Sequence, residues 1–358
     1  MGLQEITLTR FRCFDQVTIT PDPDAVTVLL SPNGTGKTSV LEAVHLLSTG
    51  QSFRTSAAGD LLQTDSDTAE VHGVVFSGVR RFQIDLVVRR GSRSTTKHLM
   101  VNGNRPSSRT ELAESLPLTV FTPEGVDVIR QGPDQRRQLL DTFAVDVNPQ
   151  DAPPFERYSR VLTQRNSLLR SFHGDYPSPA RRRELEVWDS EFVHLAHQVR
   201  RIREAFLDEL EPRLADTYSS LAGRTTPVSL EYLPSSTQPL DRALHDVLRD
   251  DIQRGYSTIG PHRDDFRVLL EHRDARRQAS QGEQRSLALA LRLAAHELVS
   301  KSGRSPLILL DDVFSELDPS RASRLIDLLP VGQTLVTTAT PLTDAFADAF
   351  IVDVRKNS

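Results

Sequence analysis

The sequence has little that would tie it to an oxidising compartment or to a membrane. Its 358 residues include one cysteine, Cys13, so an internal disulfide is excluded and a reducing compartment is expected. No apolar run approaches the roughly 20 residues that a membrane-spanning helix needs. The first residues lack the apolar core of a signal peptide, and Ile6 stands where a myristoylation signal has Ser or Thr. We therefore expect a cytoplasmic protein that does not enter the membrane.

The sequence also lacks an excess of positive charge and a recognisable metal site. The formal net charge is −5, so bulk composition gives no support to nucleic-acid binding, although a local basic patch would still permit it. His and Cys show no ligand spacing, which argues against a metal site that is independent of a nucleotide. The length suits two domains, or one domain with a large insertion.

A Gly-rich loop is the strongest motif in the sequence. Residues 26–30 form a β-favouring run before it, and the apolar residues after it fall on one helical face. The loop matches seven of the eight Walker A positions, and its residues are Ser31, Pro32, Asn33, Gly34, Thr35, Gly36, Lys37 and Thr38. We expect ATP here, with Lys37 on the β- and γ-phosphates and the Thr38 hydroxyl on Mg²⁺. Ser31, which replaces the first glycine, is the one departure. The alternative is a Gly-rich turn with a chance lysine, and the flanking strand and helix argue against it.

A pair of aspartates supplies the second half of the expected site. Leu307–Leu310 is a short apolar run, typical of a buried parallel strand, and Asp311 and Asp312 follow it. Ligands of α/β folds bind at this end of such strands. We expect Asp311 to hold Mg²⁺ and Asp312 to orient or deprotonate the attacking water, with Lys37 as the third catalytic residue.

A further phosphate-binding motif precedes this strand. Ser280–Arg285 opens a helix rich in Leu and Ala, and it resembles the signature motif of ABC ATPases, which contacts the ATP bound by the opposite subunit. We assign Ser280, Gly282 and Gln284 to ATP binding on this basis. Ser280 with Glu283 also fits an ordinary capping box, which is the alternative.

Three shorter segments resemble other ABC elements. Residues 313–318 resemble the D-loop, and residues 122–124 lie where SMC-like heads have the Q-loop glutamine, with Glu124 as its candidate replacement. Residues 337–340 follow a strand where many ABC proteins have a switch histidine. No histidine is present here, so Thr338 or Thr340 is the expected substitute.

The remaining patterns define the expected architecture. Residues 69–105 alternate like antiparallel strands, with an Asn102-Gly103 turn of the I′ type. Apolar residues at coiled-coil spacing predict a helical hairpin over about 155–216, interrupted at Arg165. The hairpin is either a projecting arm or a helix pair packed on its own domain, and we favour partial projection. The predicted fold is an α/β ABC-type P-loop ATPase head with a mixed sheet, residues 1–119 and 285–358, and a mainly helical second lobe, residues 120–284.

Two arginine-rich stretches are candidates for contact with DNA. The first surrounds the predicted antiparallel hairpin and comprises Arg80, Arg81, Arg89, Arg90, Arg93 and Lys97. The second, Arg181–Arg183, begins the second helix of the hairpin. Solvated charge on an ordinary surface is the alternative for both.

Five segments resemble the RecF family of bacterial recombination proteins and together span nearly the whole chain. They are Leu8–Arg12, Phe121–Glu124, Gly132–Asp141, Gly260–Asp265 and Leu309–Asp318. The Gly-Pro-His-Arg-Asp-Asp block at Gly260–Asp265 is specific, and its His262 is open to a structural or a nucleotide-proximal role. Thr9 and Ser31 depart from the family pattern.

The resemblance implies a DNA-dependent ATPase with slow turnover that uses ATP and Mg²⁺ and includes Arg12 among its ATP-binding residues. It implies an ATP-dependent homodimer that hydrolysis releases. It also implies binding to duplex and to gapped or single-stranded DNA, with RecR and RecO as partners in replication, repair and the SOS response.

Two other classes remain open from the sequence alone. One is the ATPase subunit of a transporter or another chromosomal SMC-like ATPase, and the other is a small-molecule kinase. About 270 residues separate Walker A from Walker B (307 minus 38 is 269), which favours the chromosomal branch over a transporter. The signature and D-loop argue against a kinase. Stimulation of ATP hydrolysis by duplex DNA would discriminate among these classes.

Overall fold

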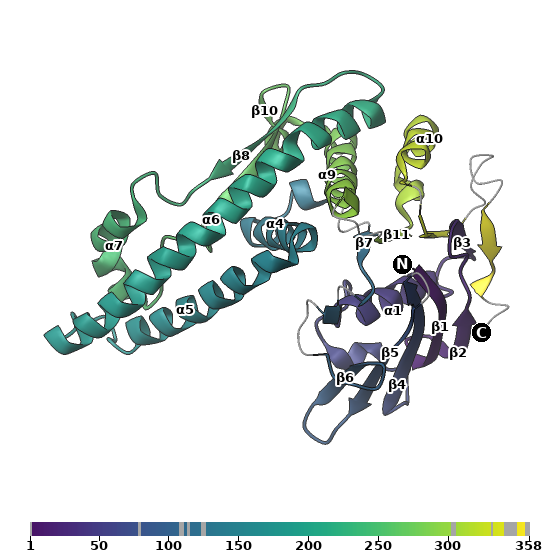
Figure 1. Cartoon of the computed structure of the whole chain (residues 1–358), viewed down its shortest axis with the longest axis horizontal. Coiled ribbons are helices and arrows are strands. Elements are labelled where there is room, and N and C mark those ends of the chain that lie inside the picture. The colour runs from purple at the N-terminus through teal and green to yellow at the C-terminus, as the bar shows by residue number, and fades with distance from the viewer. Residues whose placement is uncertain are drawn as a thin grey trace. The chain divides into compact units, whose positions relative to one another are not determined.

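The structure, a computed structural model, divides into two compact units that we describe separately (Figure 1). It describes residues 2–77, 80–106, 111–112, 115–122, 127–301, 306–330, 332–339 and 349–354. Unit 1 comprises residues 1–126 and 296–358, and unit 2 comprises residues 127–295. The boundaries expected from the sequence lie at 119/120 and 284/285. Helix α9 (Gln281–Lys301) crosses from unit 2 into unit 1.

An antiparallel sheet forms one part of unit 1. Its strands, in the order β2-β1-β4-β5-β6, are β2 (Phe14–Ile19), β1 (Gly2–Phe11), β4 (Thr68–Ser77), β5 (Arg80–Arg90) and β6 (Thr95–Val101). Alternate residues of β5 are buried, which is the pattern of a sheet with one solvated face. After β6, Asn102 and Gly103 both have positive φ, at 49° and 78°, as a type I′ turn requires.

A parallel sheet forms the other part of unit 1. Its order is β13-β3-β12-β11-β7, with β13 (Phe350–Val352), β3 (Val26–Leu30), β12 (Thr334–Thr338), β11 (Leu307–Asp311) and β7 (Leu118–Phe121). Every residue of β11 and β12 is buried, as expected for the centre of a parallel sheet. Parallel and antiparallel strands thus occupy separate sheets. The α/β class predicted from the sequence is confirmed.

Helix α1 (Lys37–Thr49) and a buried amide tie these two sheets together. The apolar side of α1 shares one core cluster with residues of both sheets, including Leu3, Leu86 and Leu309. The buried side chain of Gln333, just before β12, acts as a strand partner for Leu3. Its Oε1 accepts from the Leu3 N–H at 2.7 Å, and its Nε2 donates to the Leu3 carbonyl at 2.7 Å. The short 3-10 helix η1 (Ala58–Leu61) and helix α10 (Pro319–Leu328) complete this unit's main elements.

Unit 2 is mainly helical. Its helices are α4 (Pro133–Val147), α5 (Ala152–Arg170), α6 (Pro179–Ala222), α7 (Leu240–Arg254), the short α8 (Ala275–Gln278) and most of α9. A three-stranded antiparallel sheet accompanies them, with β8 (Val228–Leu233), β9 (Asp265–Leu270) and β10 (Arg273–Asp274). Helices α5 and α6 form the predicted hairpin, but it is not a bare arm. Helix α7 packs against both, and Leu240, Leu244 and Ile252 are buried there.

Arg165 explains the interruption of the coiled-coil pattern. Its side chain is fully buried, and Nη1 donates to Asp251 of α7 at 2.7 Å and to Ser257 at 2.7 Å. Nε donates to Asp189 of α6 at 2.7 Å. One guanidinium therefore fastens three helices by ion pairs at a position where a coiled coil would place an apolar side chain. In the part of the chain that the structure describes, no helix is both long and apolar enough to cross a bilayer.

Candidate functional site

The Gly-rich loop folds as a phosphate-binding loop would require. Gly34 and Gly36 have φ of +82° and +97°, a region that favours glycine. At Gly36 a Cβ would also lie 2.4 Å from Cζ of Phe14 and 2.6 Å from Sγ of Cys13, so a side chain is excluded there. Helix α1 begins at Lys37, immediately after the loop, and its N-terminus supplies unpaired N–H groups and a positive dipole end.

Ser31 fits without the glycine of the Walker A pattern. Its φ is not positive, so glycine is not needed at this position. The side chain is buried, and Oγ donates to Oδ1 of Asp353 at 2.9 Å. The serine therefore adds a bond between the loop and the segment that follows β13.

Lys37 lies folded against its own loop. Nζ donates to the carbonyl oxygens of Ser31, at 2.5 Å, and Pro32, at 2.9 Å. Burial lowers the pKa of Lys37, and the nearby carboxylates of Asp312 and Asp311 act in the opposite direction. The ammonium group thus bonds to two carbonyl oxygens of the loop, and phosphate oxygens could take their place.

The aspartates meet the loop as the sequence predicts. Asp311 is buried, and its Oδ1 accepts from Oγ1 of Thr38 at 2.9 Å and from Oγ1 of Thr337 at 2.8 Å. The N–H of Asp312 donates to Oγ1 of Thr337 at 2.9 Å. Asp312 has a left-handed backbone, with φ of 50°, which is uncommon outside glycine and is typical of functional positions.

Thr337 contacts both aspartates, although the sequence did not single it out. The expectation that Thr338 or Thr340 replaces the switch histidine stays a prediction. In the parallel register Asp311 pairs with Thr337, so these two side chains share one edge of the sheet. Thr338 is buried, and its carbonyl accepts from the N–H of Ser31 at 3.4 Å. Thr340 and Glu124 lie outside the described residues. Sequence reasoning missed Thr337 because the register between β11 and β12 cannot be read from either strand alone.

The oxygens of Thr38 and Asp311 suit Mg²⁺. Mg²⁺ prefers oxygen ligands, and in proteins it commonly takes one or two carboxylates, with waters and substrate phosphates completing its octahedron. Among the residues that the structure describes, no three His, Cys, Asp or Glu gather as a metal site. A cation bound by Thr38 and Asp311 would therefore draw its other ligands from water or phosphate.

A cavity of about 640 Å³ lies at the phosphate-binding loop, and its volume is in the range of small-molecule sites. Its phosphate-binding side includes Asn33, Gly34, Gly36, Lys37, Thr38, Ser39, Asp312 and Thr337. Its other lining residues are Arg12, Cys13, Arg54, Asp60, Leu62 and Thr64. Of this second group the sequence indicated only Arg12. Cys13 lies between β1 and β2, and the others come from the segment between α1 and β4, which carries no motif.

The signature residues lie in unit 2. Ser280 and Glu283 form the capping box, since the N–H of Glu283 donates to Oγ of Ser280 at 3.3 Å and the N–H of Ser280 donates to the Glu283 carboxylate at 2.8 Å. Oγ of Ser280 also donates to this carboxylate at 2.8 Å. These bonds lower the pKa of Glu283. The carbonyl of Gly282 accepts from Ser286. Gln284 is buried, and its amide bonds to Arg130 and to carbonyls of the α8 segment. Its side chain thus supports the start of α9.

Asp264 and His262 of the Gly260–Asp265 block bond to several other segments of unit 2. Asp264 accepts from Arg200 at 2.8 and 3.0 Å and from the hydroxyl of Tyr232 at 2.7 Å. His262 contacts the Tyr158 hydroxyl at 2.8 Å and the Ser257 carbonyl at 3.0 Å. Burial lowers the pKa of His262 to about 4, so the ring is neutral near pH 7. These contacts give His262 a structural place within its unit.

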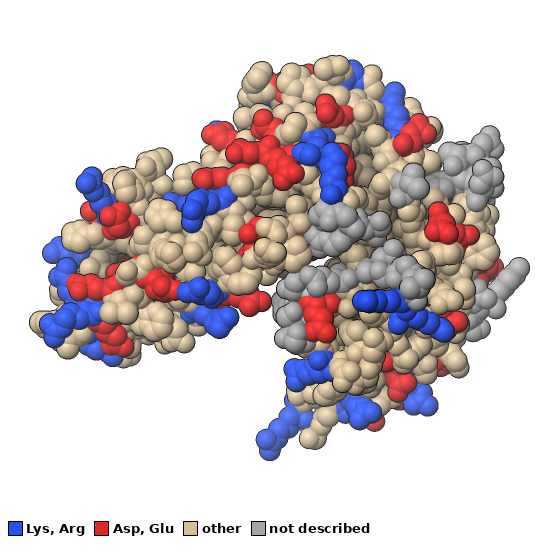
Figure 2. Space-filling view, in the orientation of Figure 1, with Lys and Arg blue, Asp and Glu red and all other residues tan. Residues whose placement is uncertain are grey.

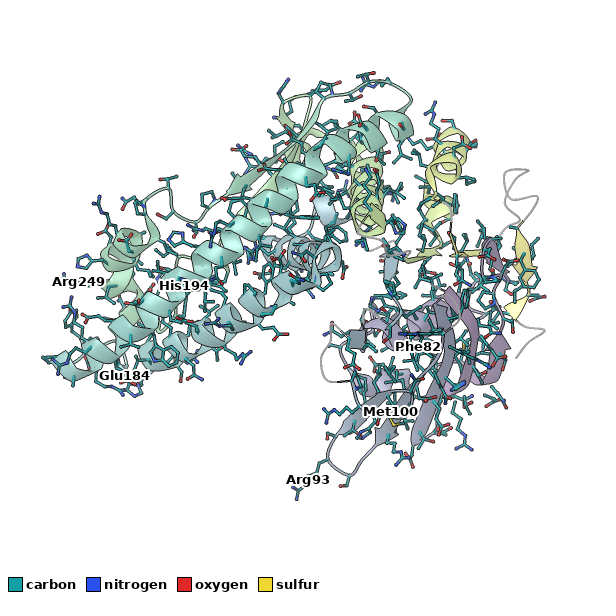
Figure 3. The ribbon with its side chains drawn as sticks, viewed as in Figure 1. Phe82, Arg93, Met100, Glu184, His194 and Arg249 are labelled. Carbon is teal, nitrogen blue, oxygen red and sulfur yellow. The ribbon has the colours of Figure 1, made fainter. Side chains whose placement is uncertain are left out.

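Four arginines of the first basic stretch lie at the two ends of one strand. Arg80 and Arg81 start β5, and Arg89 and Arg90 end it, about 33 Å away for eleven extended residues. Arg93 lies at the tip of the β5–β6 hairpin (Figure 3). Positive side chains gather around this tip in the space-filling view (Figure 2). Lys97 instead donates to the Gly50 carbonyl at 2.8 Å, at the C-terminus of α1.

The second basic stretch is balanced by acidic neighbours. Arg181 pairs with Glu184 at 3.3 Å, and Arg182 pairs with Glu186 at 3.4 Å. Figure 2 accordingly shows both signs of charge at this end of the hairpin. The arrangement is typical of a solvated helix surface.

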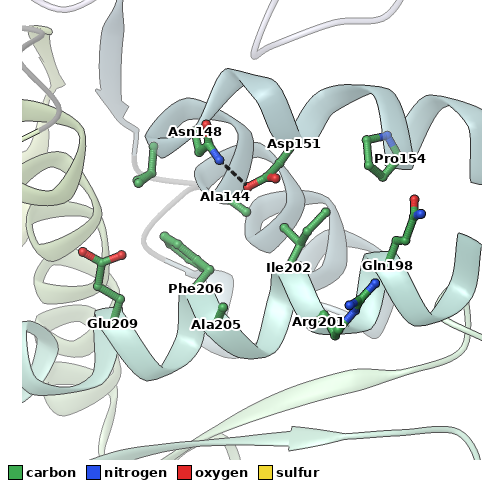
Figure 4. A pocket seen from close by; sticks show the side chains of 11 residues that line it. Ala144, Asn148, Asp151, Pro154, Gln198, Arg201, Ile202, Ala205, Phe206 and Glu209 are labelled. Atoms are coloured by element: carbon green, nitrogen blue, oxygen red, sulfur yellow. Dashed lines mark hydrogen bonds between the residues drawn. The ribbon is translucent and has the colours of Figure 1, made fainter.

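A second cavity, of about 460 Å³, lies in unit 2 between α4, α5 and α6 (Figure 4). Its apolar floor includes Ala144, Ile202 and Phe206, and Asn148 donates to Asp151 at its edge, at 3.0 Å. None of the site residues predicted from the sequence lines it.

Comparison with known proteins gives one consistent answer. The family described as RecF/RecN/SMC N terminal domain matches residues 2–353. The DNA replication and repair protein RecF of Acidothermus cellulolyticus is 33% identical over 354 residues, which cover 95% of this chain and 94% of that protein. RecF of Heliobacterium modesticaldum is 33% identical over 357 residues, covering 97% and 94%.

Solved structures agree with the sequence matches. A structure described as the recombination mediator protein RecF with ATP in the RecFOR pathway has a TM-score of 0.85 at 27% identity, covering 96% of this chain and 93% of that one. An SMC head bound to the C-winged helix domain of ScpA has a TM-score of 0.56 at 16% identity, covering 98% and 92%, and shares the fold alone. This chain belongs to the RecF/RecN/SMC N-terminal domain family, and within it to the RecF proteins, whose ABC-type ATPase head it shares.

Proposed function

We propose that this chain binds and hydrolyses ATP and acts on DNA in replication and repair. The observation that carries the proposal is the meeting of Lys37, Thr38 and Asp312 at one cavity. Asp311 lies directly behind them and accepts from Oγ1 of Thr38 at 2.9 Å. The relatives named above are DNA replication and repair proteins, and one solved relative is described with ATP. A transporter subunit or a kinase gains no support from these relatives.

Each residue of the cavity has a proposed role. Lys37 exchanges its loop carbonyls for the β- and γ-phosphates, and the N–H groups of residues 33–38 surround them. Thr38 and Asp311 hold Mg²⁺, which neutralises phosphate charge when bound. Asp312 orients or deprotonates the attacking water, and Thr337 fixes both aspartates through its hydroxyl.

The signature motif supports an ATP-dependent homodimer. Ser280 and Gly282 lie where α9 begins, and a helix N-terminus with a hydroxyl suits a γ-phosphate. In our proposal these groups contact the ATP held by a second copy, while Gln284 braces them. ATP then belongs to the interface and favours the dimer by linkage, and slow hydrolysis releases it.

The proposed DNA contact is the exposed end of the β5–β6 hairpin. Arg89, Arg90 and Arg93 are exposed there and would bind phosphates in duplex, gapped or single-stranded DNA. Action at single-strand gaps in the cytoplasm with RecR and RecO, including during the SOS response, follows from family membership and is part of the proposal.

Sedimentation with and without ATP and Mg²⁺ tests the core of this function. The wild-type chain is expected to dimerise only with the nucleotide, and Lys37→Met and Ser280→Arg are each expected to remain monomeric. ATP binding should be lost in Lys37→Met and retained in Ser280→Arg, because only the first lies in the nucleotide cavity. A Lys37→Met chain that still dimerised on ATP would refute the proposal.

A further inference from the structure

A buried carboxylate supports two arginines that line the cavity of the phosphate-binding loop. Glu42 of α1 is fully buried and touches two arginines that line the cavity, Arg12 and Arg54. Nε of Arg12 donates to it at 2.9 Å and Nη2 at 2.6 Å, while Nη1 of Arg54 donates at 3.4 Å. The hydroxyl of Ser52 donates at 2.5 Å. One carboxylate thus holds groups from two separate segments, one with Arg12 and the other with Ser52 and Arg54.

The backbone around Arg12 is also fixed. Arg12 has a left-handed backbone, with φ of 55°, and its N–H donates to the Leu61 carbonyl at 3.0 Å. The N–H of Gln63 donates to the Arg10 carbonyl at 2.9 Å, so the two segments are joined on both sides of Phe11. The guanidinium of Arg12 is therefore held at its stem by the backbone and at its head by Glu42.

The arginines held by Glu42 are suited to an anionic ligand. Within this cluster a single negative charge, that of Glu42, faces the two positive charges of Arg12 and Arg54. Asp60 lines the same cavity and accepts from the hydroxyl of Thr55. The bidentate pair with Glu42 uses the Nε–Nη2 edge of Arg12, which leaves Nη1 for another acceptor. Arginines in such a fixed geometry suit phosphate oxygens, which accept charge-assisted hydrogen bonds.

We infer that Glu42 is a positioning residue. It holds Arg12 and Arg54 against a phosphate group of the bound nucleotide other than those that Lys37 contacts. Glu42 touches no ligand itself, because it is buried behind the two arginines. It governs nucleotide affinity and leaves the hydrolysis step to the aspartates. This inference rests on the proposed nucleotide function.

Equilibrium binding of a fluorescent ATP analogue, together with steady-state ATP hydrolysis, tests the role. Glu42→Gln keeps the size and one oxygen acceptor but removes the charge. We expect Kd and KM for ATP to rise about tenfold, equal to about 1.4 kcal/mol, with kcat at saturating ATP within twofold of wild type. Glu70→Gln, an exposed carboxylate on β4, is the matched control and should bind like wild type.

A double-mutant cycle separates positioning from general support of the fold. Arg54→Ala alone should raise Kd several-fold, and Glu42→Gln should add much less in the Arg54→Ala background than in wild type. Additive effects, or a fall in kcat at unchanged KM, would overturn the inference. If Glu42→Gln does not fold, Arg54→Ala decides by itself, because its side chain is 40% exposed. An unchanged Kd in that variant would also overturn it.

The two proposals fail differently in this experiment. A wild-type chain that binds no ATP contradicts the proposed function. A wild-type chain that binds ATP while Glu42→Gln and Arg54→Ala bind it equally well contradicts only the role of Glu42.

Discussion

Individual residues explain where the phosphate-binding loop needs glycine and where it does not. Ser31 is tolerated because its backbone is not left-handed and its hydroxyl finds Asp353, whereas Gly36 is required by φ and by the closeness of Phe14. A motif position that is written as glycine therefore needs glycine only where the backbone or a neighbour demands it.

The bond between Ser31 and Asp353 should contribute to stability. Asp353→Ala leaves the buried Ser31 hydroxyl without this acceptor, which typically costs about 1–3 kcal/mol. Urea unfolding would measure the loss, and Asp24→Ala, at an exposed residue, is the control with an expected change within about 0.5 kcal/mol. Equal stabilities of the two variants would show that the bond is dispensable.

Two histidines, the half-buried His262 and the buried His296, should make the protein acid-sensitive. Burial lowers the pKa of His262 and of His296 to about 4, below the ordinary value of 6.5. Between pH 6.5 and 4 the unfolded chain binds protons that the folded protein excludes, so stability falls as the pH is lowered through this window. Each ring contributes up to about 3 kcal/mol to this loss.

Replacement of one ring tests this pH dependence. The free energy of unfolding of His296→Asn should fall less between pH 6.5 and 4.5 than that of wild type, whatever its value at pH 7. His194→Asn, at an exposed position, should keep the wild-type slope. Identical slopes for all three proteins would contradict the proposed origin of the acid sensitivity.

At the scale of elements, polar side chains decide how the helices of unit 2 meet. The hairpin of α5 and α6 follows from apolar spacing, but α7 is held to both helices by Arg165 with Asp189 and Asp251. The sequence shows Arg165 as a break in a pattern and gives no sign of its partners, because they lie 24 and 86 residues away.

Truncation of Arg165 should destabilise unit 2 strongly. Arg165→Ala leaves the fully buried Asp251 without its cation, and breaking a buried pair typically costs about 3–5 kcal/mol. Arg160→Ala is a matched control on the same helix, since Arg160 is exposed and pairs with Glu156 at 3.8 Å. Its expected cost is below about 1 kcal/mol. Chemical denaturation of both variants compares them, and a loss below 1 kcal/mol for Arg165→Ala would contradict the proposed importance of this network.

At the scale of the whole molecule, the motif residues of the site could be predicted from the sequence, whereas the residues that surround them could not. Both Walker motifs, their strands and their meeting point follow from local patterns, because Gly-rich loops and apolar strands are short-range signals. Thr337, Arg54 and Glu42 reach the cavity region through strand register or helix packing, which no local pattern encodes. The separation of antiparallel and parallel strands into two sheets was hidden for the same reason.

DNA binding should distinguish the two arginine-rich stretches. Charge reversal at Arg89, Arg90 and Arg93 is expected to weaken DNA binding and to reduce the slope of log K against log salt by about 2–3, near 0.9 for each lost phosphate contact. The same change at Arg181, Arg182 and Arg183 is the control and should leave the slope nearly unchanged, because Arg181 and Arg182 already pair with acidic residues. A larger effect at the control positions would move the interface to the helical hairpin.

The bond from Ser31 to Asp353 has a practical consequence for reading related sequences. The Walker A, signature, Walker B and D-loop motifs all end by Asp318, yet the loop is anchored 35 residues later, since 353 minus 318 is 35. A shortened copy that stops before Asp353 would pass any search by motif. It would nevertheless have lost the anchor of its phosphate-binding loop, so an intact set of motifs does not certify a working ATPase.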